Sequence, residues 1–198
     1  MINHKHKLIF IHIPRTGGTT IERALCGRDW FNIHAPSKHL TAHSAKKIYA
    51  EYWEEYFKFT FVRNPWDRMV SLLKYGSFYG VSLGDRNIIN TENYFTNFKK
   101  VEYDQRYFNE NQFNNHNPIK ESVYQNIFGT EMDFIGKLES LEGDLSKICS
   151  INKMKCAKLH HAEKSLNRKQ YREYYDTKTR QLIEEKYYKD IKLFNYEF

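Results

Sequence analysis

Cysteine is scarce in this chain. Its 198 residues include three cysteines, Cys26, Cys149 and Cys156, an odd and widely spaced set without a C-x-x-C pair. Such spacing indicates neither a disulfide framework nor a thiolate zinc site. We therefore expect buried free thiols in a reducing compartment.

Long apolar runs, repeats and low-complexity tracts are also missing. No stretch approaches the roughly 18 apolar residues that a membrane-spanning helix needs. The apolar run Leu8–Ile11 is too brief for the core of a signal peptide, and no cleavage site follows it. The sequence thus predicts a soluble, cytoplasmic protein without stable membrane insertion.

The composition favours one folded domain over residues 1–198. Apolar residues make up 40% of the chain, with 14 Phe, 15 Tyr and 3 Trp, which predicts an aromatic-rich core and argues against disorder. The net charge of +7 indicates an anionic partner, which could be a nucleic acid, a nucleotide, an acidic glycan or a membrane surface. Charge alone does not choose among them.

A strand, a glycine turn and a helix open the chain. Residues 7–13 form a nearly continuous apolar run, typical of a parallel strand buried on both faces. A short helix over 21–26 follows and ends at Gly27, a residue suited to the position after a helix. The turn between them brings backbone N–H groups and the positive end of the helix to one point, which predicts a phosphate-binding loop. Its contributors are Thr16, Gly17, Gly18, Thr19 and Thr20.

This loop differs from that of nucleoside triphosphatases. No Lys follows the second glycine, and the basic residue, Arg15, precedes the glycines instead. Without the Lys-Ser/Thr pair the loop has no Mg²⁺ ligand, so we do not expect ATP or GTP hydrolysis.

The second half of the site begins near residue 57. An amphipathic helix is predicted over 41–56 and an aromatic strand over 57–62. Arg63 ends the strand, and Asn64-Pro65 is a strong helix start. Further on we predict a strand over 132–138 and helices over 141–149, 167–175 and 177–188. The fold class expected is α/β, with a central, mostly parallel sheet flanked by helices.

Residues 77–118 are rich in Asn and have weak apolar periodicity. We interpret them as an irregular segment that is either an acceptor-binding insertion or lid, or a plain insertion without a binding role.

Two runs of sequence carry a resemblance to a known family. Residues 10–20 resemble the 5′-phosphosulfate loop of the bacterial and Golgi-type carbohydrate sulfotransferases, and residues 57–71 resemble their 3′-phosphate motif. Residues 171–198 also resemble the end of these chains. The resemblance implies a P-loop-like sulfotransferase fold and the donor 3′-phosphoadenosine-5′-phosphosulfate. It also implies a glycan or other hydroxyl acceptor and a reaction without a metal.

The same resemblance implies roles for individual residues. Arg63 would bind the 3′-phosphate with its guanidinium and Ser71 would donate a second hydrogen bond. Arg15 stands where relatives usually carry Lys, near the departing oxygen; it keeps the charge but cannot give up a proton. Ser165 lies in a stretch resembling the nucleotide-contacting loop and is either a further phosphate ligand or a simple loop serine.

The general base is predicted to be His39, which lies 24 residues before Arg63, close to where related enzymes carry a catalytic His. An imidazole titrates near neutrality and suits this role. His43 is the next option, and an ordinary capping or surface histidine is the third. A zinc site built on His39 and His43 lacks the Glu of H-E-x-x-H.

Two other functions stay open at this level. Basic and aromatic residues alternate near Lys169–Arg172, as in a nucleic-acid-binding module, although no recognised motif for nucleic acids is present. A nucleotide kinase of related topology is the second alternative. We expect no nucleic-acid partner, and oligomeric state has no signal in the sequence.

Overall fold

A four-stranded sheet forms the centre of the computed structural model, which describes residues 1–77, 122–159 and 169–198. The strand order is β1 (Ile2–Asn3), β2 (Leu8–Ile11), β3 (Phe57–Val62) and β4 (Phe134–Lys137). β1 pairs with β2 in antiparallel fashion, whereas β2, β3 and β4 are parallel. The expected α/β fold with a mostly parallel central sheet is confirmed.

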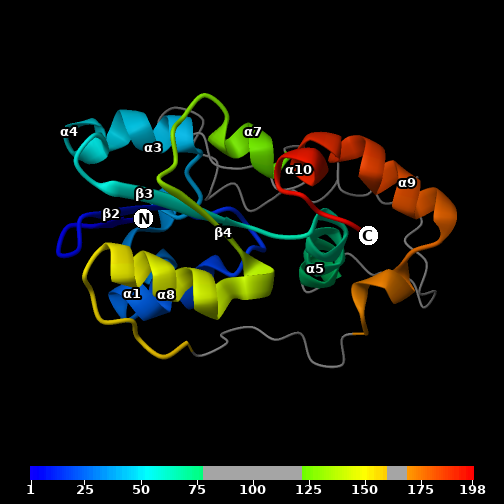
Figure 1. Cartoon of the computed structure of the whole chain (residues 1–198), viewed down its shortest axis with the longest axis horizontal. Coiled ribbons are helices and arrows are strands. Elements are labelled where there is room, and N and C mark those ends of the chain that lie inside the picture. The colour runs from blue at the N-terminus through cyan, green and yellow to red at the C-terminus, as the bar shows by residue number, and fades with distance from the viewer. Residues whose placement is uncertain (78–121, 160–168) are drawn as a thin grey trace.

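Helices cover both faces of the sheet (Figure 1). α1 (Gly18–Cys26) and α8 (Leu141–Ile151) lie on one face, where Leu8 and Phe10 enter the core. The opposite face carries α3 (Ala42–Ile48), α4 (Ala50–Trp53) and α7 (Val123–Ile127), against which Ile9 and Ile11 pack. Successive residues of β2 thus serve opposite cores, which explains the continuous apolar run.

A third core lies beyond the carboxyl end of β3. It is built on α5 (Pro65–Ser77) and α9 (Thr177–Lys186), with Trp66, Ile183 and Tyr187 buried in it. η4 (Tyr171–Tyr174) and α10 (Tyr188–Leu193) flank these helices. The remaining short elements are α2 (Phe31–His34), η1 (Ala35–Ser37) and η3 (Leu138–Ser140).

Two helix predictions are corrected. The helix expected over 41–56 is divided into α3 and α4 at Tyr49, whose φ of −103° and ψ of 28° leave helical geometry. This break lets Tyr49, Trp53 and Tyr56 all enter one core. The helix expected to span 167–175 is the 3₁₀ turn η4 over its described part.

The insertion or lid predicted over 77–118 lies outside the described residues, apart from Ser77 at the end of α5. None of the helices in the described ranges is long and apolar enough to cross a membrane.

The expectation of free thiols is wrong for two cysteines. Cys149 and Cys156 form a disulfide, while Cys26 is free. The chain turns back after α8, where Lys153 adopts a left-handed φ of 50°, and this turn returns Cys156 to the helix. This pair weighs against the reducing compartment that the cysteine spacing had suggested, and the cytoplasmic location stays a prediction.

Candidate functional site

The carboxyl ends of β2 and β3 lie side by side because the strands are parallel, with Ile11 opposite Thr60. Arg15 follows β2 and has a left-handed φ of 67°. Arg63 Nη1 donates to the Arg15 carbonyl at 3.0 Å, and Arg68 Nε donates to the Pro14 carbonyl at 3.1 Å. Two arginines of residues 57–71 therefore hold the backbone of the loop that follows β2.

The turn before α1 contains two left-handed residues, Arg15 and Gly17. Gly17 has a φ of 86°, and its carbonyl accepts hydrogen bonds from the N–H groups of Thr20 and Ile21. Gly18 begins α1 in close contact with the buried ring of His12, where a Cβ atom would overlap the ring. Left-handed residues before a helix start turn successive N–H groups toward one point, where an anion binds.

The three threonines of the loop differ in their surroundings. The Thr16 hydroxyl is fully buried and donates to the Ile13 carbonyl at 2.8 Å. This hydrogen bond holds the turn, and the contribution of Thr16 to a phosphate site stays a prediction. Thr19 is half-buried and Thr20 is buried at the start of α1.

The predicted residues of the second motif contact the loop directly. Arg15 Nε donates to Ser71 Oγ at 3.0 Å. Since a guanidinium can only donate, Ser71 accepts this bond and its own proton points elsewhere. Arg63 also forms an ion pair with Asp67, with Nε 2.8 Å from Oδ2. The structure thus brings Arg15, Arg63 and Ser71 into one cluster.

Asn64 fixes the start of α5, as predicted. Its Oδ1 accepts from the N–H groups of Trp66 and Asp67 at 3.1 and 3.3 Å. Its own N–H donates to Glu139 Oε1 at 2.7 Å, and its Nδ2 donates to the Glu197 carbonyl at 2.8 Å. These contacts hold Arg63 and α5 in a fixed position relative to the sheet.

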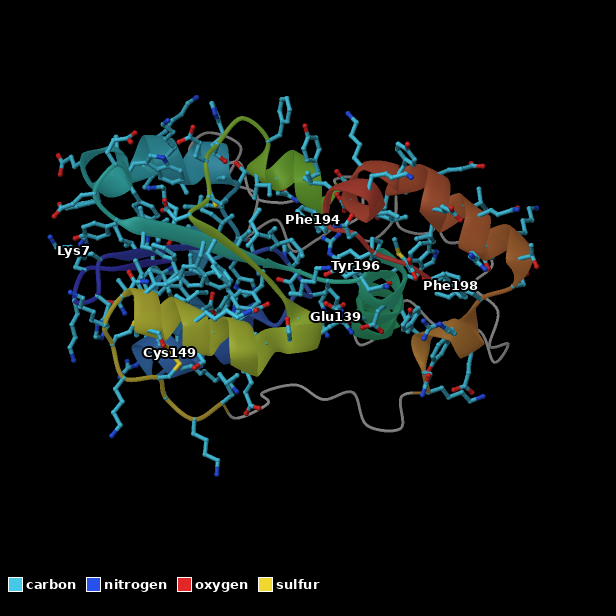
Figure 2. The ribbon with its side chains drawn as sticks, in the orientation of Figure 1. Lys7, Glu139, Cys149, Phe194, Tyr196 and Phe198 are labelled. Atoms are coloured by element: carbon cyan, nitrogen blue, oxygen red, sulfur yellow. A yellow bond between two sulfur atoms is a disulfide. The ribbon has the colours of Figure 1, made fainter. Side chains whose placement is uncertain are left out.

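Glu139 links this point to the C-terminal residues. Its Oε2 accepts from the Tyr196 hydroxyl at 3.1 Å, and Figure 2 labels both residues near the same end of the sheet. Burial first, and then the charge of Glu139, raise the pKa of Tyr196 above its ordinary value. Glu139 therefore accepts hydrogen bonds from both Asn64 and Tyr196.

His39 lies half-buried behind the loop. Its Nδ1 is 3.1 Å from the His12 carbonyl, and the two rings meet edge to face at 4.4 Å between centroids. A carbonyl can only accept, so the proton of the neutral ring sits on Nδ1 and Nε2 carries the lone pair. His43, the alternative, is exposed on α3.

A buried charge network behind the loop escaped sequence reasoning. Glu22 is 0% exposed, and its Oε1 lies 2.6 Å from His12 Nδ1. Its Oε2 lies 3.3 Å from Lys38 Nζ, and Lys38 also pairs with Asp29. The spacing of Glu22 in the sequence was the available signal. Gly18, Ile21 and Leu25 lie on the same face of α1 and are buried, so the burial of Glu22 could have been predicted from this spacing.

Ser165 lies outside the described residues, so its role stays a prediction. Within the described ranges, no group of three or more His, Cys, Asp or Glu side chains could hold a metal ion.

A model of the protein family described as "Sulfotransferase family" matches residues 1–197. No curated protein and no solved structure matches the chain.

Proposed function

The chain belongs to the sulfotransferase family, and on this premise we propose that it moves a sulfuryl group from 3′-phosphoadenosine-5′-phosphosulfate to a hydroxyl of a glycan or glycoconjugate. The proposal is carried by the direct contact between the two anion-binding motifs. Arg63 Nη1 holds the Arg15 carbonyl at 3.0 Å, and Arg15 Nε meets Ser71 Oγ at 3.0 Å.

A single donor with anionic groups at both ends fits this arrangement. The turn from Arg15 to Gly18 would bind the 5′-phosphosulfate, and Arg63 with Ser71 would bind the 3′-phosphate. Arg63 and Ser71 both contact Arg15, the first residue of the turn, so the two binding regions adjoin each other.

The reaction needs a base for the acceptor. The acceptor oxygen attacks sulfur in line, its proton passes to His39 Nε2, and the bond between sulfur and the 5′-phosphate oxygen breaks. Adenosine 3′,5′-bisphosphate leaves. The His12 carbonyl keeps the His39 proton on Nδ1, so the lone pair on Nε2 can act as the base. Arg15 stabilises the charge that develops on the departing oxygen, and it keeps its own proton.

The basic surplus suits both partners of this reaction. The donor is a polyanion, and an acidic glycan would be attracted by the same +7 charge. The choice of a glycan as acceptor rests on the family resemblance of residues 10–20 and 57–71, whose side chains meet in the cluster described above.

Donor use can be measured directly. Calorimetry should detect binding of adenosine 3′,5′-bisphosphate, and a panel of glycans and small alcohols should accept label from radioactive donor. Oligonucleotide binding that the bisphosphate does not compete with would favour a nucleic-acid-binding module instead. ATP turnover with Mg²⁺ would favour a nucleotide kinase.

The catalytic roles have their own test. We expect Arg15→Ala to lower kcat by about 100-fold or more, the usual effect of removing such a donor. Arg23→Ala, an exposed arginine on α1, is the matched control and should retain activity. His39→Ala should remove the pH-dependent limb that reports the base, while His43→Ala should keep it. Near-normal turnover of Arg15→Ala, or loss of that limb only in His43→Ala, would refute these assignments.

A further inference from the structure

Lys38 is a buried cation that the proposed reaction does not use. It follows η1 and is 7% exposed. Its Nζ forms ion pairs with Glu22, at 3.3 Å from Oε2, and with Asp29. The same ammonium donates to Thr19 Oγ1 at 3.4 Å. Lys38 thereby joins the buried carboxylates to the anion-binding loop.

The direction of this hydrogen bond determines what the Thr19 hydroxyl can do. An ammonium has three N–H donors and no acceptor, so Thr19 Oγ1 must accept. The hydroxyl proton then points away from Lys38. Thr19 is the second residue of α1, at the point where the helix start meets the turn, so this proton can be donated to an anion there. Without the ammonium, the hydroxyl could rotate and donate to a carbonyl of the preceding turn.

The position of Lys38 is itself fixed by buried contacts. Glu22 accepts from the Trp30 N–H at 3.1 Å and contacts His12 Nδ1 at 2.6 Å. Both residues are buried with it, so the carboxylate cannot shift easily. A fixed carboxylate holds the ammonium, and the fixed ammonium orients the hydroxyl.

We infer that Lys38 is a positioning residue for the donor, acting through the Thr19 hydroxyl on the 5′-phosphate. This inference rests on the proposed function. It predicts that Lys38 affects binding of the 5′ end of the nucleotide and leaves binding of the 3′ end unchanged. A purely structural role would affect both ends alike.

Two nucleotides and a set of variants test this. Calorimetry compares adenosine 3′,5′-bisphosphate with adenosine 3′-monophosphate, which lacks the 5′-phosphate. Lys38→Met is combined with Asp29→Asn, so that the buried cluster keeps its net charge, and Asp29→Asn alone is the control. Thr19→Val removes the hydroxyl at nearly constant volume. If the double variant Lys38→Met, Asp29→Asn does not fold, Lys38→Gln replaces Lys38→Met; the glutamine side chain is one bond shorter than that of lysine.

We expect Thr19→Val to weaken bisphosphate binding by about 10-fold or more, as for a hydrogen bond to a charged group. Lys38→Met with Asp29→Asn should weaken it several-fold, and adding Thr19→Val should give no more loss than Thr19→Val alone. Every variant should bind the monophosphate within about twofold of the unaltered chain, since the 3′-phosphate contacts are untouched.

Three results would overturn the inference alone: unchanged bisphosphate binding in the Lys38 variant, equal weakening of both nucleotides, or fully additive effects with Thr19→Val. If the unaltered chain binds neither nucleotide, the proposed function fails and the inference fails with it. The two failures are therefore distinguishable.

Discussion

Gly18 is the position at which a single added methyl group should damage the site most. A Cβ built on Gly18 would lie 2.5 Å from His12 Cγ and closer still to two other ring atoms. The ring is 3% exposed and is enclosed by Phe10 and His39, with ring centroids at 5.6 and 4.4 Å. In Gly18→Ala the ring must move by about 1 Å or more to restore ordinary contact.

The expected loss follows from what that movement breaks. Overpacking a buried site costs about 1–3 kcal/mol. Losing the 2.6 Å contact between His12 and Glu22 adds about 1.5–3 kcal/mol, the usual range for a hydrogen bond to a charged group. Alanine gains at most about 1 kcal/mol over glycine as a helix residue. Gly18→Ala should therefore lower the free energy of unfolding by about 1.5–6 kcal/mol.

Urea denaturation measures this value, and a double-mutant cycle tests its cause. His12→Ala makes room for the new methyl, so the His12→Ala, Gly18→Ala pair should be at least about 1 kcal/mol more stable than the two single losses predict. Gly143→Ala on α8 is the matched control: nothing lies within 4 Å of its Cβ, and it should be neutral or stabilising. Additive losses, or a Gly18→Ala loss below about 1 kcal/mol, would refute the reasoning.

Two further predictions concern stability. Burial raises the pKa of Tyr187 from 10.0 to about 12. Between these two pH values the folded state keeps a proton that the unfolded state has lost. The free energy of unfolding therefore falls as the pH rises from 10 to 12, by about 2–3 kcal/mol in total. Denaturation at several pH values should show Tyr187→Phe lacking this part of the decline, and parallel curves for the two proteins would contradict it. Removal of the Cys149–Cys156 disulfide by reductant or by Cys149→Ser, Cys156→Ser should cost about 2 kcal/mol, as expected for a short closed loop. Cys26→Ser is the control and should leave the melting temperature and its response to reductant unchanged. If reductant does not change the melting temperature of the unaltered chain, the pairing of Cys149 with Cys156 is disproved.

The elements that hold the site were predictable because their signals are local. An apolar run marks β2, Gly27 ends α1 with φ of 75°, and Asn64 begins α5 with its own side chain. The break at Tyr49 was not predictable, since the apolar spacing of 41–56 continues through it and only the shared core requires it. The disulfide was missed because a sequence separation of seven between two cysteines carries no signal unless the chain is known to reverse between them.

The convergence of Arg15, Arg63 and Ser71 was implied by the family resemblance, and it agrees with parallel neighbouring strands that bring their carboxyl ends to one edge. The details of their contacts did not. Arg15 and Ser71 are 56 residues apart in the chain, and nothing local indicates that one donates to the other. The inward position of Glu22 was available from its spacing on α1, but its partners Lys38 and Asp29 come from a later, irregular stretch.

The two motifs act as one structural unit, and this bears on the arginine at position 15. A left-handed φ at a non-glycine residue costs about 1–2 kcal/mol, and Arg15 adopts one with φ of 67°. Arg63 and Arg68 hold the carbonyls of Arg15 and Pro14, which offsets that strain and fixes the turn. The Arg15 guanidinium reaches Ser71 through Nε and has four further N–H groups, whereas an ammonium is a compact point charge. An arginine here therefore strengthens the link between the two motifs. In the proposed reaction, the residue that would stabilise the departing oxygen also contacts the serine that would bind the other end of the donor.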